Sequence, residues 1–319
     1  MKKSKKMAGF SLLELLVVVT LIAIVATLAV TRLSNIHVKS AEVLNMANVS
    51  RIGPAIEAFM TANERSLNRL DLVMTDKVKG TAGDYDTSPD YMLILTNVAG
   101  NIGLSTALIN SSGVPLLAKY HLETKDVLAL EELGLTSLMR LRRQGSDGNG
   151  VTTGDDGEWS TGLTEDPDTC LSIATRVERG LAVPCINAVS MGNSTDNTPL
   201  GALVYQSCGQ DVRLHDNSSF SIYINGIDKG MNTTDVMGYL KENGGILLAF
   251  GIGQYASFIG NTSSGLDSAP VCSVMAKDTY RRYFLLIRLE TFKGITRAQY
   301  AGVMDANGNT MKQLRAASK

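Results

Sequence analysis

An apolar stretch near the N-terminus constrains the fold of this 319-residue chain more than any other feature. It covers residues 10–30 and reads FSLLELLVVVTLIAIVATLAV, with Glu14 as its one charged residue. As a helix, a stretch of this length would extend about 31 Å, which matches the hydrocarbon layer of a membrane. We therefore expect residues 10–31 to form the transmembrane half of an N-terminal helix.

Positive charge is concentrated just before this stretch, in Lys2, Lys3, Lys5 and Lys6. Lysines beside a membrane helix favour the cytoplasmic side, so the chain after about Arg32 is expected outside the cytoplasm. The formal net charge of the whole chain is only −1, which argues against nucleic-acid binding by bulk electrostatics. We expect a single-pass inner-membrane protein whose C-terminal domain lies outside the cytoplasm.

The small residues before the apolar stretch indicate how the N-terminus is processed. A secretory signal peptide is cut at small residues after its apolar run, whereas here Ala8-Gly9 comes before Phe10. The order of basic leader, Gly9, Phe10 and then Glu14 in a long apolar run resembles the type IV prepilin family, which includes type IV pilins and type II secretion pseudopilins. The resemblance implies that a prepilin peptidase removes residues 1–9 by cutting between Gly9 and Phe10, and that Phe10 is then N-methylated.

Glu14 is also a functional candidate on physical grounds, because an unpaired carboxylate in a membrane helix costs about 2–3 kcal/mol. The new α-amino group of Phe10 is a suitable partner. The amine of a neighbouring subunit fits better, since Phe10 lies only one turn away in the same chain. Such a pair would set the axial register between subunits, which is the assembly role that the resemblance implies. The alternative is that Glu14 simply lies in the headgroup zone of the membrane.

Residues 32–62 are expected to continue the helix as its amphipathic half. Apolar residues recur there every three to four positions, with polar residues between them. These apolar positions are Leu33, Ile36, Val43, Leu44, Ala47, Ile52, Ile56, Phe59 and Met60. Gly53-Pro54 predicts a kink or break, because proline lacks the amide donor, and the helical pattern then resumes over 56–70.

Residues 63–319 are expected to form an extracytoplasmic globular domain. Strand-like runs occur at 201–208, 219–225, 245–251, 283–291 and 298–304, a helix is predicted over 235–242, and Asn307-Gly308 predicts a turn. Because the prepilin family packs its sheet on the amphipathic part of the helix, the predicted fold class is α+β, with a long N-terminal helix on an antiparallel sheet. Residues 91–143, which include a predicted helix over 125–132, are interpreted as a partly helical insertion.

Four cysteines lie in the second half of the chain, at Cys170, Cys185, Cys208 and Cys272. None has the spacing of a zinc or redox motif, so disulfides are favoured if this half is exported. Proximity in sequence suggests pairing Cys170 with Cys185 and Cys208 with Cys272. The alternative is buried thiols.

The polar, glycine-rich segment between Gln144 and Asp168 is the one candidate for a metal site. Asp147, Asn149, Asp155 and Asp156 could supply oxygens to calcium, and an EF-hand-like reading aligns part of this set. The first ligand place holds Gly145, however, and an aspartate replaces the final bidentate glutamate. A solvated loop without a cofactor is the favoured interpretation.

No nucleotide-binding or nucleophile motif accompanies the three histidines, His37, His121 and His215. We therefore expect a non-enzymatic subunit of a type IV pilus or a type II secretion-type pseudopilus. Its expected partners are other pilins in a filament, prepilin peptidase, an inner-membrane assembly platform with a separate ATPase, and lipids before assembly. The alternative functions are a membrane-anchored binding module or adhesin and, third, an anchored enzyme.

Overall fold

The computed structural model describes residues 12–62, 67–76, 92–94, 104–109, 114–141, 171–190, 199–215, 219–224, 227–232, 236–273, 275 and 279–317. The chain divides into two compact units, Met1–Leu44 and Asn45–Lys319. We call the second unit the head. The first unit is described through its helix, and the head contains the sheets and all other helices of the described residues.

Helix α1, Leu12–Ala62, is one continuous helix of 51 residues with Pro54 inside it. Of the predicted kink or break at Gly53-Pro54, the break does not occur, because the buried apolar face around the proline outweighs the one hydrogen bond that it removes. The helix ends at Ala62, as the predicted 32–62 half requires, and Leu70 lies in a strand rather than in a resumed helix.

The structure does not confirm the transmembrane span predicted for the first half of this helix. Within the part of the chain that the structure describes, no helix is long and apolar enough to cross a membrane. Residues 10 and 11 of this predicted segment lie outside the described residues. The side chains of Glu14 and of residues 28–31 lie outside them too.

The main sheet of the head has eight strands and confirms a mixed helix and sheet fold with an N-terminal helix. Its central path runs β13-β12-β11-β1-β5-β6, and β7 pairs with both β11 and β4. The strands are β1 (Leu70–Asp71), β4 (Leu117–His121), β5 (Ser137–Leu141), β6 (Leu171–Arg176), β7 (Ala182–Ile186), β11 (Ile246–Gly251), β12 (Phe284–Phe292) and β13 (Ile295–Met304).

One pair in this sheet departs from the predicted antiparallel arrangement. Strands β1 and β5 are parallel, with Leu70 opposite Leu138, whereas all other recorded pairs in the described sheet are antiparallel. A parallel pair needs a long crossover, and the chain between Asp71 and Ser137 provides one. The segment 91–143, interpreted as an insertion, thus supplies β4 and β5 to the main sheet, together with α3 (Thr124–Glu132).

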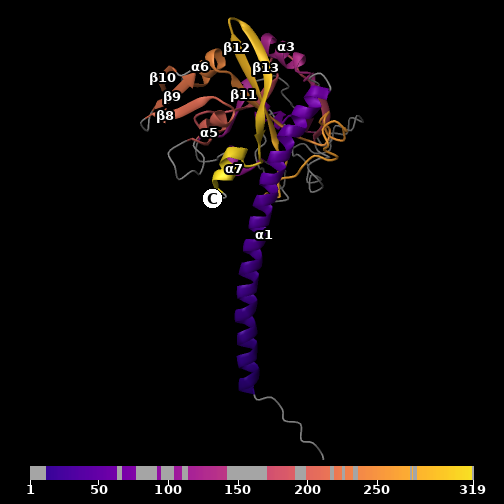
Figure 1. Ribbon diagram of the computed structural model, residues 1–319, viewed down its shortest axis with the longest axis vertical. Helices are drawn as coiled ribbons and strands as arrows, with labels where there is room; N and C mark the ends of the chain where they lie inside the picture. Colours follow the sequence, from indigo (N-terminus) through magenta and orange to yellow (C-terminus); the bar gives the residue numbers. More distant parts are fainter. Residues whose placement is uncertain are drawn as a thin grey trace, which may run out of the picture. The chain divides into compact units, whose positions relative to one another are not determined.

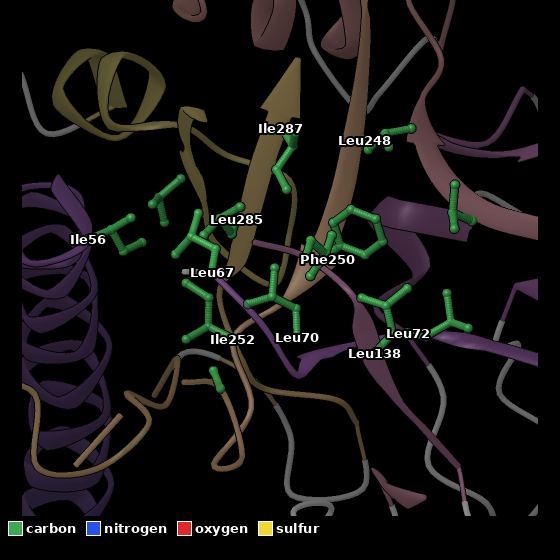
Figure 2. Packing of buried hydrophobic residues seen from close by; sticks show 14 of the residues in the cluster. Ile56, Leu67, Leu70, Leu72, Leu138, Leu248, Phe250, Ile252, Leu285 and Ile287 are labelled. Atoms are coloured by element: carbon green, nitrogen blue, oxygen red, sulfur yellow. The ribbon is translucent and has the colours of Figure 1, made fainter. Parts of the chain in front are cut away.

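Both faces of the sheet are buried, each by its own set of helices. Along β11, Leu248 and Phe250 belong to one core cluster and Leu247 and Ala249 to the other, as alternation along a strand requires. The first cluster includes residues of α1 and α3; Figure 2 shows Ile56 of α1 facing the side chains of the sheet. The second includes residues of α2 (Thr106–Ile109), α5 (Leu200–Ser207) and α6 (Val236–Asn243).

Smaller elements complete the head. A three-stranded antiparallel sheet, β8 (Asp211–His215), β9 (Ser219–Ile224) and β10 (Ile227–Asn232), lies beside α5 and α6 in Figure 1. Strands β2 (Met74–Asp76) and β3 (Met92–Ile94) form a two-stranded sheet, and α7 (Met311–Ala317) follows β13.

Four of the five predicted strands are confirmed to within a few residues, as β9, β11, β12 and β13, and the helix predicted over 235–242 is α6. The fifth, 201–208, is wrong because this segment forms α5, which starts directly after Pro199. Its buried residues, Ala202, Val204 and Tyr205, mark one face of a helix. A Cβ at Gly201 would lie 1.8 Å from the carbonyl oxygen of Asn187, so glycine permits the close approach of this helix to the chain.

Candidate assembly helix and buried polar sites

The first part of α1 exposes a continuous apolar surface. Leu12 is 82% exposed and Ile22 is 62% exposed, and other large apolar side chains between them are also exposed. This set contains Leu12, Leu13, Leu15, Leu16, Val17, Val18, Val19, Leu21, Ile22, Ile24 and Val25. Scattered exposed leucines are ordinary in soluble proteins, but a contiguous run of this size marks a surface that another apolar surface covers.

Two threonines in this part of α1 form hydrogen bonds within the helix. Thr20 Oγ1 donates to the carbonyl oxygen of Val17 at 2.8 Å, and Thr27 Oγ1 donates to that of Ala23 at 2.8 Å. A hydroxyl bonded in this way makes no demand on water. The two threonines are thus compatible with an apolar surrounding.

The predicted processing residues fall at the edge of the described chain. Gly9 and Phe10 lie outside the described residues, and Glu14 lies within α1, although its side chain is outside them. The roles assigned to these three residues therefore stay predictions.

The last part of α1 is packed into the core of the head. Ile52, Ile56 and Phe59 are almost completely buried in the first cluster, and the Phe59 ring lies 6.0 Å from that of Phe258. Of the apolar positions predicted for 32–62, Ile52, Ile56 and Phe59 are buried, whereas Val43, Leu44 and Ala47 are exposed. The spacing of three and four residues places the buried side chains on one face.

Asp71 in β1 is a carboxyl group buried in the centre of the head. Its Oδ2 accepts a hydrogen bond from Tyr280 Oη at 2.8 Å, and its Oδ1 has no hydrogen-bond partner. Burial raises the pKa of Asp71 to about 7, although the Tyr280 hydroxyl and the Arg282 guanidinium oppose the rise. A Cβ at Gly253 would lie 2.1 Å from Oδ1, so the backbone of Gly253 approaches this carboxyl group closely.

A second polar group links α3 to α6 at the surface. Lys241 donates to Glu123, and Glu123 also pairs with Lys125 at 3.4 Å. These contacts lower the pKa of Glu123. Beside them, Tyr120 Oη donates to the buried carboxylate of Asp126 at 2.7 Å, and Asp126 in turn caps the start of α3 through the Glu123 amide. Each group serves to hold a helix end, and the arrangement is structural.

The predicted disulfides are wrong. Cys185, Cys208 and Cys272 are thiols in the structure, while Cys170 lies outside the described residues. Cys272 belongs to the first core cluster and Cys208 packs against the second, so the sheet separates the pair that sequence proximity suggested. Burial raises the pKa of the Cys185 and Cys208 thiols to about 12, which makes both poor nucleophiles.

The calcium candidates Asp147, Asn149, Asp155 and Asp156 lie outside the described residues. Among the residues that are described, no three His, Cys, Asp or Glu side chains gather in a way that could hold a metal ion. His121 is half-buried in β4, where it pairs with Ala182 in the sheet register.

Comparison with known proteins identifies the N-terminal segment. Residues 4–30 match the family model for the prokaryotic N-terminal methylation motif, which is the type IV prepilin-like signature. The resemblance predicted from Gly9, Phe10 and Glu14 is confirmed. A motif of this kind is typical of membrane-anchored prepilin-type proteins that a prepilin peptidase processes. No curated protein and no solved structure matches the chain.

Proposed function

We propose that this protein is a non-enzymatic structural subunit of a type IV pilus or a type II secretion-type pseudopilus, assembled through its N-terminal helix. The observation that carries the proposal is the combination of the methylation motif over residues 4–30 with the exposed apolar surface of α1 that follows it.

In this proposal, the exposed apolar surface of α1 is covered in two successive environments. Before assembly, the lipid tails of the inner membrane cover the apolar side chains. After assembly, the helices of neighbouring subunits cover them in the core of the filament. Both environments are apolar, so the helix moves between them without exposing this surface to water.

Glu14 gives assembly its specificity in this proposal. Apolar side chains alone define no axial position, because leucine and valine recur all along the exposed run. A carboxylate paired with the methylated amine of Phe10 in a neighbouring subunit would select one position, since any other leaves a charge unpaired in an apolar medium.

The ionisable groups of the head favour a structural role rather than catalysis. Asp71 accepts a hydrogen bond from Tyr280 in the buried centre of the head, and Glu123 and Asp126 hold helix ends. The buried thiols of Cys185 and Cys208 are held in their neutral form.

The first test is the mass of the N-terminal peptide in sheared surface material and in the cell envelope. N-methylated Phe10 in sheared material supports a surface pilus, and the same peptide confined to the envelope supports a pseudopilus or a minor initiating subunit. An intact leader, or a cut after residue 30, would overturn the proposal in favour of a plain membrane anchor that carries a binding module.

A second test separates processing from assembly. Glu14→Ala should abolish incorporation into filaments while cleavage after Gly9 continues. Thr20→Val is the matched control, because it replaces a hydroxyl that bonds only within its own helix and should leave incorporation normal. Wild-type amounts of filament from the Glu14→Ala variant would contradict the assembly role.

A further inference from the structure

Asn45 is the first residue of the head, and it is one of the few buried polar residues of the described part of α1. Its side chain is 2% exposed, whereas Val43 and Leu44 just before it are 61% and 51% exposed. Burying an amide is unfavourable unless its donors and acceptors are bonded. The contacts of Asn45 therefore show what the buried position provides.

The amide of Asn45 is bonded on both sides. Its Nδ2 donates to Asp305 Oδ2 at 2.8 Å, and its Oδ1 accepts from Tyr283 Oη at 2.7 Å and from Cys272 Sγ at 3.5 Å. Asn48, one turn further along the helix, donates to Tyr283 Oη at 3.3 Å. The helix is thus joined to three segments that follow it by more than 200 residues.

Both carboxylate oxygens of Asp305 accept hydrogen bonds in this arrangement. Its Oδ1 accepts from the backbone amides of Asn307 and Asn309 at 2.9 and 2.8 Å, and its Oδ2 accepts from Asn45 and, at 3.4 Å, from Asn309 Nδ2. Four donors fill the capacity of a carboxylate. The turn at Asn307-Gly308 is thereby held in one shape, with its carboxylate directed at the helix.

The apolar packing of α1 is partly repetitive along the helix axis. Val49, Ile52, Ile56 and Phe59 are spaced by three or four residues, and a shift by one turn would exchange Ile52 and Ile56, so these two contacts do not distinguish the positions. The same shift would bring Ala41 or Val49 to the place of Asn45. Neither side chain bonds to Asp305 or Tyr283, so Asp305 Oδ2 would lose its shortest contact and the Tyr283 hydroxyl would lose the amide oxygen that accepts from it.

We propose that Asn45 is the positioning residue that fixes the axial register of α1 within the head, through a clasp formed with Asp305, Tyr283 and Cys272. A buried asparagine sets register in this way in helical coiled coils, where the apolar contacts repeat along the helix. The functional part of this inference rests on the proposed assembly role, because force applied to an assembled helix reaches the head where the helix enters it.

Hydrogen exchange of the full chain in detergent micelles tests the clasp without reference to filaments. Asn45→Leu keeps a side chain of similar size and removes every polar contact. We expect exchange over 45–62 to become at least about tenfold faster, while peptides of β11 and β12 keep their protection. Equal loss of protection throughout the head would assign a merely structural role to Asn45, and unchanged exchange over 45–62 would overturn the clasp.

Asn48→Ala is the matched control on the same helix. It removes one long hydrogen bond from Asn48 to Tyr283 and leaves Asn45 bonded to Asp305. It should change exchange over 45–62 much less than Asn45→Leu does. An equal effect would place the register in the general packing of the helix rather than in the clasp.

The Asn45→Asp variant provides a second test, because its protection from hydrogen exchange should depend on pH. Asn45→Asp places a carboxylate against Asp305, and the other ionisable groups facing it are Tyr283 and Cys272. Two carboxylates at this distance repel when both are charged and bond when they share a proton. Protection over 45–62 should be lost at pH 7.5 and regained at pH 5, after correction for intrinsic exchange rates. Protection that does not recover in acid would contradict the clasp.

The filament assay then separates this inference from the proposed function. Asn45→Leu should be cleaved after Gly9 normally and should incorporate into filaments several-fold less than wild type or Asn48→Ala. Faster exchange over 45–62 with normal incorporation would overturn the clasp's role in assembly and leave the subunit role intact. Absence of cleavage in the wild-type chain would instead remove the proposed function.

Discussion

Two aspartates of the head are almost equally buried and differ in the number of hydrogen bonds that their carboxyl groups accept. Asp305 is 1% exposed and accepts four hydrogen bonds, whereas Asp71 is 2% exposed and accepts one from Tyr280. One oxygen of Asp71 has no partner at all. Burial alone therefore does not decide the state of a carboxyl group; the donors around it do.

The local backbone explains this difference. Asp305 lies at the start of a turn, where successive amides point at its side chain, as aspartate at a turn commonly arranges. Asp71 lies in β1 between β5 and β11, and in this position the neighbouring amides serve the sheet. Its side chain can reach only groups from the next layer, which here means Tyr280.

The largest expected effect is the loss of the Asp305 carboxylate. Asp305→Ala leaves the buried amide of Asn45 and the half-buried backbone amides of Asn307 and Asn309 without this acceptor, at about 1–3 kcal/mol for the buried group and less for each of the others. We expect unfolding of the head in urea at a clearly lower midpoint, with a total loss of roughly 3 kcal/mol or more. Asp305→Asn keeps one acceptor oxygen and should lose less. Equal midpoints for Asp305→Ala and wild type would show that the hydrogen bonds of Asp305 do not stabilise the head.

The second effect is a dependence of stability on pH that comes from Asp71. Its pKa is about 7 in the folded chain and near 3.8 when unfolded, so the folded state keeps the proton that the unfolded state releases between these values. The contribution of Asp71 is fully present below pH 3.8 and is lost as the pH rises through 7, by roughly 2–4 kcal/mol.

The Asp71→Asn variant isolates this contribution. Asparagine cannot ionise, so the free energy of unfolding of the variant should fall less than that of wild type between pH 4 and 7. The difference between the two curves is the quantity to measure, because other groups titrate equally in both. Parallel curves would show that Asp71 keeps an ordinary pKa.

Neither carboxylate could be singled out from the sequence. Asp71 and Asp305 look like ordinary surface aspartates there, because their burial follows from pairing between segments far apart in the chain, β1 with β11 and β13 with α1. The turn at Asn307-Gly308 was predictable, since asparagine and glycine favour it, and Gly308 has a φ of 84°. Its carboxylate partner on the helix was not.

The sequence predicted best where a pattern is local and periodic. The amphipathic spacing of Ile52, Ile56 and Phe59 and the strand runs of β11 to β13 depend on neighbours in the chain. The predictions that failed required knowledge of distant partners: the pairing of Cys208 with Cys272, which lie in different core clusters, and α5, whose glycine approaches another segment. The candidate processing site was predictable because it is a linear motif.

The third effect concerns the space around Asp71. Gly253→Ala would place a methyl group 2.1 Å from Asp71 Oδ1 and 2.5 Å from its Cγ, so either the strand end or the buried carboxyl must move. We expect a loss of about 1–3 kcal/mol in the free energy of unfolding. Gly238→Ala is the matched control. Nothing lies within 4 Å of its added Cβ in α6, and it should stabilise the head by about 0.5–1 kcal/mol.

The smallest effect tests whether all four donors of Asp305 matter equally. Asn309 Nδ2 lies 3.4 Å from Oδ2, at the limit of a hydrogen bond, while the amides of Asn307 and Asn309 lie 2.9 and 2.8 Å from Oδ1. Asn309→Ala removes only the long contact and keeps both short ones, so urea unfolding should show a loss below about 1 kcal/mol. A loss as large as that of Asp305→Ala would mean that the side chain of Asn309, rather than the backbone of the turn, supplies the decisive hydrogen bond to Asp305. In that case the contrast with Asp71 would depend on a single amide group, and Asp305 would lose its place as the fixed acceptor for Asn45.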